Sequence, residues 1–200
     1  MKPTATLFLV IIISFFFSAS CANNNQSQDS PVKPVSQEEP VYQLALSLNE
    51  EKQVGKWENG KADLSGLSLP FSFSWEGSVY EVHKASTIGW EKQSGTFNLY
   101  LSLEVFNRNT GDTLLYAAPL NLINRLNPKG SPLPCCQAYL HLCKPTKGAA
   151  QGFQRNSNAC IIGCDCGKSP CDHSLSTGDL KGTDLISEIS RHLIANSDSN

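Results

Sequence analysis

The chain has 200 residues, of which 16 are basic and 18 acidic, and 40% of all residues are hydrophobic. This length and apolar content suit one folded domain, or one domain with a small appendage. The charges are scattered, with no run of Lys and Arg and no acidic tail, so the composition argues against a nucleic-acid partner.

Residues 1–20 are predicted to be an export signal sequence. Lys2 supplies a positive charge, and an apolar run follows over 7–17 (LFLVIIISFFF). Ser18, Ala19 and Ser20 are the small residues that a signal peptidase requires before its cut. The run is too short for a membrane anchor, which needs about 20 apolar residues, and no basic stop-transfer group follows it.

The predicted cut leaves Cys21 at or near the new N-terminus. The stretch Ser18-Ala19-Ser20-Cys21 resembles the lipobox of bacterial lipoproteins, in which the cysteine is linked to diacylglycerol. Ser18 departs from the pattern, because an aliphatic residue is usual at that position. The resemblance implies lipidation at Cys21 and a place in the cell envelope, on a membrane that faces the periplasm or the exterior. Ordinary secretion without a lipid is the alternative.

Residues 21–40 are predicted to be a disordered spacer. From residue 22 on they are mainly Asn, Gln, Ser, Pro and Glu, with two valines as the only sizeable apolar side chains. Such a segment buries too little apolar surface to offset the entropy lost on ordering. Lipoproteins commonly hold a folded domain away from the membrane on a spacer of this kind.

Residues 41–128 are predicted to form an antiparallel β domain of about five to seven short strands. Apolar and polar residues alternate over 42–48, over 71–75 and, most clearly, over 97–106. A turn cluster at 107–112 leads into a return strand over 113–123, which Pro119 is expected to interrupt at an edge or bulge.

The segment 99–116 (LYLSLEVFNRNTGDTLLY) resembles the immunoglobulin-type sandwiches of many envelope proteins. The resemblance implies an immunoglobulin-like β-sandwich, whereas the short strands with polar turns by themselves predict a β-sandwich or a small open barrel. Three aromatic residues of this domain, Trp57, Trp90 and Phe106, are expected to be edge packing, with stacking on a sugar or peptide as the alternative.

Residues 129–175 are expected to be an irregular region stapled by disulfides, because they hold seven of the eight cysteines. Each bridge contributes about 2–4 kcal/mol. If Cys21 is lipidated, the seven that remain are an odd number, so one must stay free, reach another molecule or bind a ligand. The candidates are Cys135, Cys136, Cys143, Cys160, Cys164, Cys166 and Cys171.

A metal site is the alternative use of this region. Four thiols and one imidazole that suit zinc, or copper through the thiolates alone, lie within 14 residues. Against it, the paired C-x2-C spacing of familiar zinc sites is absent, so no resident cofactor is predicted. The ligands would be Cys160, Cys164, Cys166, Cys171 and His173.

Residues 176–200 are predicted to contain one short amphipathic helix and a tail. Asp184 is placed to cap the helix. Its apolar face should dock on the sheet or on the cysteine-rich region, and it comprises Leu185, Ile186, Ile189, Leu193 and Ile194.

Together these features predict a lipid-anchored envelope protein with a binding or structural role, its partner an unidentified protein or glycan. No catalytic motif is readable, and the neighbours Cys143 with His141 and Cys171 with His173 lack an orienting group, so no enzyme activity is predicted. The alternatives are a metal-handling protein that uses 160–173 and a freely secreted, disulfide-rich effector or ligand.

Overall fold

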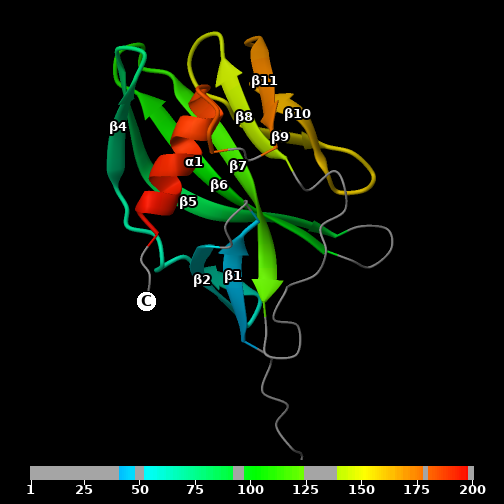
Figure 1. Ribbon diagram of the computed structural model, residues 1–200. Coiled ribbons are helices and arrows are strands. Elements are labelled where there is room, and N and C mark those ends of the chain that lie inside the picture. Colours follow the sequence, from blue (N-terminus) through cyan, green and yellow to red (C-terminus); the bar gives the residue numbers. More distant parts are fainter. Residues whose placement is uncertain (1–40, 48–51, 92–96, 124–138, 178–179, 198–200) are drawn as a thin grey trace, which may run out of the picture. The chain divides into compact units, whose positions relative to one another are not determined.

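The computed structural model describes residues 41–47, 52–91, 97–123, 139–177 and 180–197. They all belong to one compact unit, Glu38–Asn200. The predicted signal sequence, lipidation site and spacer lie outside the described residues. Within these residues the elements (Figure 1) are β1 (Tyr42–Leu46), β2 (Lys52–Glu58), β3 (Lys61–Asp63), β4 (Phe71–Trp75), β5 (Ser78–Glu91), β6 (Phe97–Asn107), β7 (Thr113–Ile123), β8 (Leu140–Pro145), β9 (Gly152–Arg155), β10 (Ile161–Asp165), β11 (Cys171–Ser176) and α1 (Leu185–Ala195).

Most of these strands join one curled antiparallel sheet in the order β3-β2-β1-β7-β6-β5-β4, and β8 and β11 extend it from β7. The central strand is β7, which pairs with β6 along one edge and with β8 and then β1 along the other. The predicted mainly-β antiparallel fold with one short C-terminal helix is confirmed. A single curled sheet is closer to the open barrel than to a sandwich of two separate sheets.

Contrary to the sequence prediction, Pro119 does not interrupt the return strand. It lies opposite Tyr100 of β6, and its carbonyl accepts a hydrogen bond from the Ser47 amide at 2.9 Å. On that edge of β7 the pairing with β8 ends at Ala117, and the pairing with β1 begins at Leu120. The N–H that proline lacks therefore falls between two partner strands, where no ladder hydrogen bond is lost.

A tight turn of two residues joins β4 to β5. Glu76 and Gly77 both have positive φ, 45° and 75°. Positive φ at both central residues is the signature of a type I′ turn, whose twist matches that of the flanking strands. Glycine adopts it without strain, and the turn sets Trp75 at the end of β4 beside Ser78 at the start of β5.

The central strands are buried on both faces. Leu101 and Leu103 of β6 face the main core as predicted, and each is fully buried. Tyr100 points to the opposite face, which the alternation of apolar and polar residues along β6 predicts to be polar. It is also fully buried. The second face is buried because the cysteine-rich region packs over it.

The helix α1 lies against the inner side of the curled sheet, where β4, β8 and β11 contact it (Figure 1). The predicted cap is confirmed: the Asp184 carboxylate accepts a hydrogen bond from the Ser187 amide at 2.8 Å. Inside the interface, the hydroxyls of Tyr116 and Ser190 are 2.9 Å apart. The predicted apolar face is buried in the core through Leu185, Ile186, Ile189 and Leu193, with Ile194 packed at its margin.

The described part of the cysteine-rich region forms four strands, where the sequence analysis expected irregular structure. Leu140 and Leu142 face the main core, while His141 and Cys143 face the opposite side. This alternation lets β8 pair with β7 in the same sheet as the preceding strands. The hairpin of β9 and β10 forms a separate two-stranded sheet, and Phe153 of that hairpin packs on the outer face.

Candidate ligand-binding cleft

A cleft of about 450 Å³ opens between the N-terminal end of α1 and the inner side of the sheet. A smaller hollow of about 210 Å³ adjoins it, because Trp75 and Lys144 line both. Ligand pockets of small molecules typically measure about 300–1,000 Å³ and often occupy the mouths of barrels. The larger part is lined by Trp75, Leu142, Lys144, Asp172, Ser174, Leu175, Asp184, Leu185 and Ile186.

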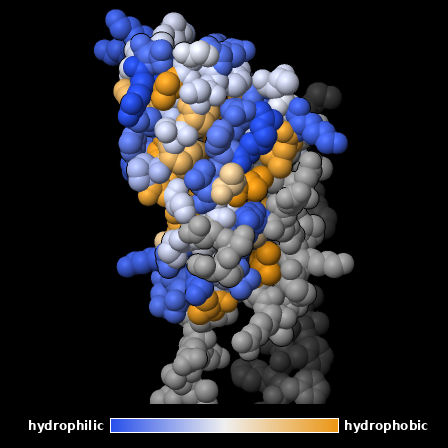
Figure 2. Space-filling view, turned by 60° about the vertical axis from the view of Figure 1, so that its left-hand side comes forward, coloured by the Kyte–Doolittle hydropathy of each residue, from blue (hydrophilic) through white to orange (hydrophobic). Residues whose placement is uncertain are grey.

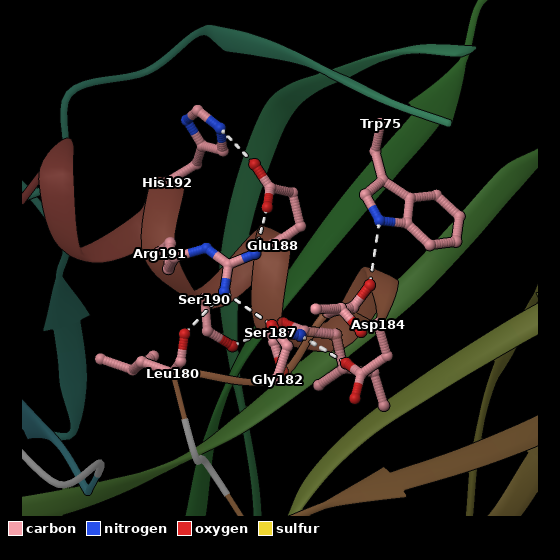
Figure 3. A network of polar contacts seen from close by, with 11 residues as sticks. Trp75, Leu180, Gly182, Asp184, Ser187, Glu188, Ser190, Arg191 and His192 are labelled. Atoms are coloured by element: carbon pink, nitrogen blue, oxygen red, sulfur yellow. Dashed lines mark hydrogen bonds and ion pairs between the residues drawn. The ribbon is translucent and has the colours of Figure 1, made fainter. Parts of the chain in front are cut away.

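One wall of the cleft is aromatic. Trp75 is half-buried at the end of β4, and its indole Nε1 donates to the Thr183 carbonyl at 3.4 Å (Figure 3). Its ring lies 6.5 Å from the ring of Tyr80, tilted by 58°. The strand and the segment before α1 therefore hold the indole from two sides.

The opposite wall is polar and comes from β8 and β11. Lys144 and Asp172 are direct cross-strand partners, and Leu142 and Ser174 are the next partners on the same face. Lys144 and Asp172 make no ion pair within 4.0 Å among the described residues, so both charged groups remain exposed to the cleft.

The rim beside α1 is held by a polar network (Figure 3). Arg191 donates to the carbonyls of Leu180 and Gly182, at 2.6 and 2.7 Å, and also pairs with Glu188. This guanidinium lowers the pKa of the Glu188 carboxyl, and His192 lies 3.0 Å from the same carboxylate. The segment that carries Asp184 is thus anchored to the helix that follows it.

The rim of the smaller hollow is the turn between β6 and β7. The Asn107 amide oxygen accepts from the Asn109 and Thr110 amides, at 2.9 and 3.3 Å. The Asp112 carboxylate accepts from the Gly148 amide at 2.7 Å. Hydrogen bonds from the Thr110 hydroxyl and the Gly148 amide lower the pKa of the Asp112 carboxyl.

Charged and polar groups therefore surround an indole in a cleft with an apolar floor, and they offer stacking and hydrogen bonding to a small ligand. The alternation over 71–75 predicts Trp75 on a strand but assigns it to no site, and no sequence motif singles out Lys144 or Asp172. No local pattern marks these residues, because they come from three strands that only the fold brings together.

The aromatic residues that were predicted as edge packing or as a stacking surface lie elsewhere. Trp57 packs at the margin of the main core. Trp90 packs on the outer face, with the Arg155 guanidinium 5.6 Å from its ring centroid. Phe106 is 36% exposed. On the face drawn in Figure 2, apolar side chains reach the surface in separate patches between polar ones.

The prediction of disulfide bridges is confirmed in the described part of the cysteine-rich region. Cys143 of β8 is bonded to Cys164 of β10, with 5.5 Å between their Cα atoms. Cys166 is bonded to Cys171, with 5.9 Å between Cα atoms. Cys160 is also disulfide-bonded, and its partner lies outside the described residues, as do Cys21, Cys135 and Cys136.

These bridges bear on the metal alternative. Cys160, Cys164, Cys166 and Cys171 are all in disulfides, and a disulfide sulfur is not a thiolate ligand. Among the residues that the structure describes, no group of three or more His, Cys, Asp or Glu side chains is placed to hold a metal ion. A metal site of these cysteines would require the bridges to be reduced first.

His173 pairs with His141 and not with a cysteine. Nδ1 of His141 lies 3.1 Å from Nε2 of His173, and the ring planes differ by only 3°. The ring centroids are 5.4 Å apart. Because this separation is the N–N distance plus the two ring radii, the imidazoles meet edge to edge in one plane. One ring donates and the other accepts.

His141 lies under the β9–β10 hairpin and is 1% exposed. Its Nε2 has no hydrogen-bond partner among the described residues. Burial, together with the neighbouring His173, lowers the pKa of His141 to about 4. Burial also lowers the pKa of His173 and raises that of Tyr100 to about 12. The pair is therefore uncharged at neutral pH.

This pair predicts a loss of stability in mild acid. The unfolded chain protonates His141 near the ordinary pKa of 6.5, whereas the folded protein does so only near 4. The free energy of unfolding should therefore fall between pH 6.5 and 4, by up to about 3 kcal/mol from this group. Urea unfolding across this pH range should show the fall in unfolding free energy in the wild type and in His83→Gln, a control at an exposed histidine. His141→Gln should flatten it, and an unchanged slope in that variant would contradict the assignment.

Comparison with known proteins adds no family assignment, since no protein family, curated protein or solved structure matches the chain. In the part of the chain that the structure describes, no helix is long and apolar enough to cross a membrane.

Proposed function

We propose that this chain is an exported, lipid-anchored protein of the cell envelope whose folded body binds a saccharide unit of a glycan in the cleft beside α1. The export signal, the lipobox-like Cys21 and the polar spacer support the location. The observation that carries the binding role is the cleft itself, with Trp75 on one wall and exposed polar groups on the other.

A sugar ring fits this lining by its chemistry. It has an apolar C–H face that can stack on an indole, and hydroxyls around its edge that both donate and accept hydrogen bonds. The cleft offers the Trp75 ring, the Ser174 hydroxyl, the Asp172 carboxylate and the Lys144 ammonium for these contacts. Its volume of about 450 Å³ lies in the lower half of the range for small-ligand pockets, which suits one or two rings more than a long peptide.

The test is a titration of the folded protein with tetrasaccharides, followed through the indole N–H signals in NMR spectra. The chain has three tryptophans, so each signal can be assigned from the variants Trp57→Phe, Trp75→Phe and Trp90→Phe. Addition of the N-acetylglucosamine tetramer or of cellotetraose at millimolar concentration should shift the Trp75 signal and leave the other two in place.

Trp75→Phe should weaken binding at least about tenfold, as the loss of a large stacking group in a binding site does. Trp90→Phe is the matched control, because Trp90 lies on the other face of the sheet, and it should bind like the wild type. If no saccharide moves the Trp75 signal, or if Trp90→Phe is the variant that fails to bind, the proposed role of the cleft is wrong.

A further inference from the structure

More negative than positive side chains line the cleft. The larger part carries Asp172, Asp184 and Lys144, and the smaller part adds Glu76 and Asp112. Four carboxylates thus stand against one ammonium group. A concave site lined mainly by one sign of charge raises the local concentration of the opposite sign.

Two of these carboxylates are occupied within the protein. Asp184 caps α1 through the Ser187 amide, and Asp112 accepts from the Gly148 amide. The side chains of Asp172 and Glu76 make no hydrogen bond or ion pair that the described residues show, and both residues are exposed. They are therefore the carboxylates that remain free to accept from a ligand.

The positions of Glu76 and Asp172 relative to Trp75 favour a positively charged ligand. Glu76 follows Trp75 directly and lines the smaller hollow, while Asp172 lines the larger part across from the indole. An indole face also attracts a cation, because the negative charge of its π-system lies above the ring. A positively charged group in the cleft would thus find a carboxylate in either part and an aromatic wall between them.

Resting on the proposed saccharide role of the cleft, we propose that its ligand is an amino sugar with a free amine, whose ammonium group is bound by Asp172. Ser174 and Lys144 lie beside Asp172 on the same face of β8 and β11. Lys144 reduces the negative potential around Asp172, so it limits the affinity of this part of the cleft for a cation.

The experiment compares three probes on the full folded chain at low salt, by calorimetry: the glucosamine tetramer, its N-acetylated counterpart and cellotetraose. The glucosamine tetramer should bind about fivefold more tightly than either neutral probe, the scale of one partly exposed ion pair. The preference should shrink at high salt, because ions screen exposed charges.

Three variants locate the effect. Asp172→Asn should reduce the preference for the glucosamine tetramer over the neutral probes to less than about twofold, and Lys144→Gln should increase it. Asp165→Asn is the matched control, because Asp165 is an exposed aspartate on β10 outside the cleft, and it should leave the preference unchanged.

The outcomes separate the two proposals. If all three probes bind with equal affinity, or if Asp165→Asn removes the preference as much as Asp172→Asn does, the amine specificity is wrong while the saccharide role stands. If none of the three probes binds, the saccharide role itself fails, and the specificity proposal fails with it.

Discussion

Replacement of Cys21 by serine is expected to move the protein from the membrane fraction to the soluble fraction almost completely. The mature wild-type chain should begin at Cys21 and carry acyl chains, each CH2 of which contributes about 0.8 kcal/mol when buried in the bilayer. Cys21→Ser removes the thiol that forms the thioether, and with it this anchor. Membrane fractionation and the intact mass of the chain from a bacterial host measure both effects.

A second variant tests whether lipidation increases when the lipobox is completed. Ser18→Leu supplies the aliphatic residue that a lipobox usually has three positions before the cysteine, and it should raise the lipidated fraction above that of the wild type. A wild-type chain without acyl mass, in either fraction, would contradict the lipid anchor and favour ordinary secretion.

The same mass spectra bear on the cysteine count. With Cys21 acylated, seven cysteines remain, and at most six of them can form bridges within the chain. Cys160 is bridged to a cysteine outside the described residues, and we expect this partner to be Cys135 or Cys136. Whichever of these two is not bridged to Cys160 should carry the one thiol that reacts with a maleimide in denaturant.

Removal of the bridge between β8 and β10, in Cys143→Ala/Cys164→Ala, should cost about 3 kcal/mol of unfolding free energy, from the chain entropy of a loop of this length. The two cysteines are 21 residues apart. The same bridge fixes the β9–β10 hairpin over Tyr100 and His141, so its loss should also let the hairpin open locally.

The matched control is Cys166→Ala/Cys171→Ala, whose cysteines are only five residues apart. The shorter loop predicts a smaller cost of about 2 kcal/mol. Hydrogen exchange should become fast across β9 and β10 in the first variant only, and urea unfolding gives the two free energies. Equal stability losses together with unchanged protection of the hairpin would show that the Cys143–Cys164 bridge does not hold it.

Much of the fold is readable from local patterns. The alternation from Leu99 to Val105 places a strand and chooses its core face, and both features are present in the structure. Asp184 followed by the apolar spacing of α1 predicts the helix and its cap. Asn59 and Gly60 form the β2–β3 turn with φ of 50° and 71°, and Asn-Gly is a hairpin signal that is readable from the sequence as well.

The errors and omissions share a cause. Pro119 looked like a strand breaker because its missing N–H was judged without knowing which strand would lie beside it. Tyr100 looked like a residue of an open face because the hairpin that covers it comes later in the chain. In each case the deciding contact is far away in sequence, and periodicity carries no information about it.

By itself, the sequence determined the antiparallel strands, the helix and the disulfide-forming character of the last cysteines, because each rests on neighbouring residues or on composition. Only the tertiary structure decided which cysteines pair, that His141 bonds His173, and that Trp75 faces Lys144 and Asp172 across a cleft. These arrangements depend on the curl of the sheet and on the register of its strands, which long-range packing sets and local sequence does not encode.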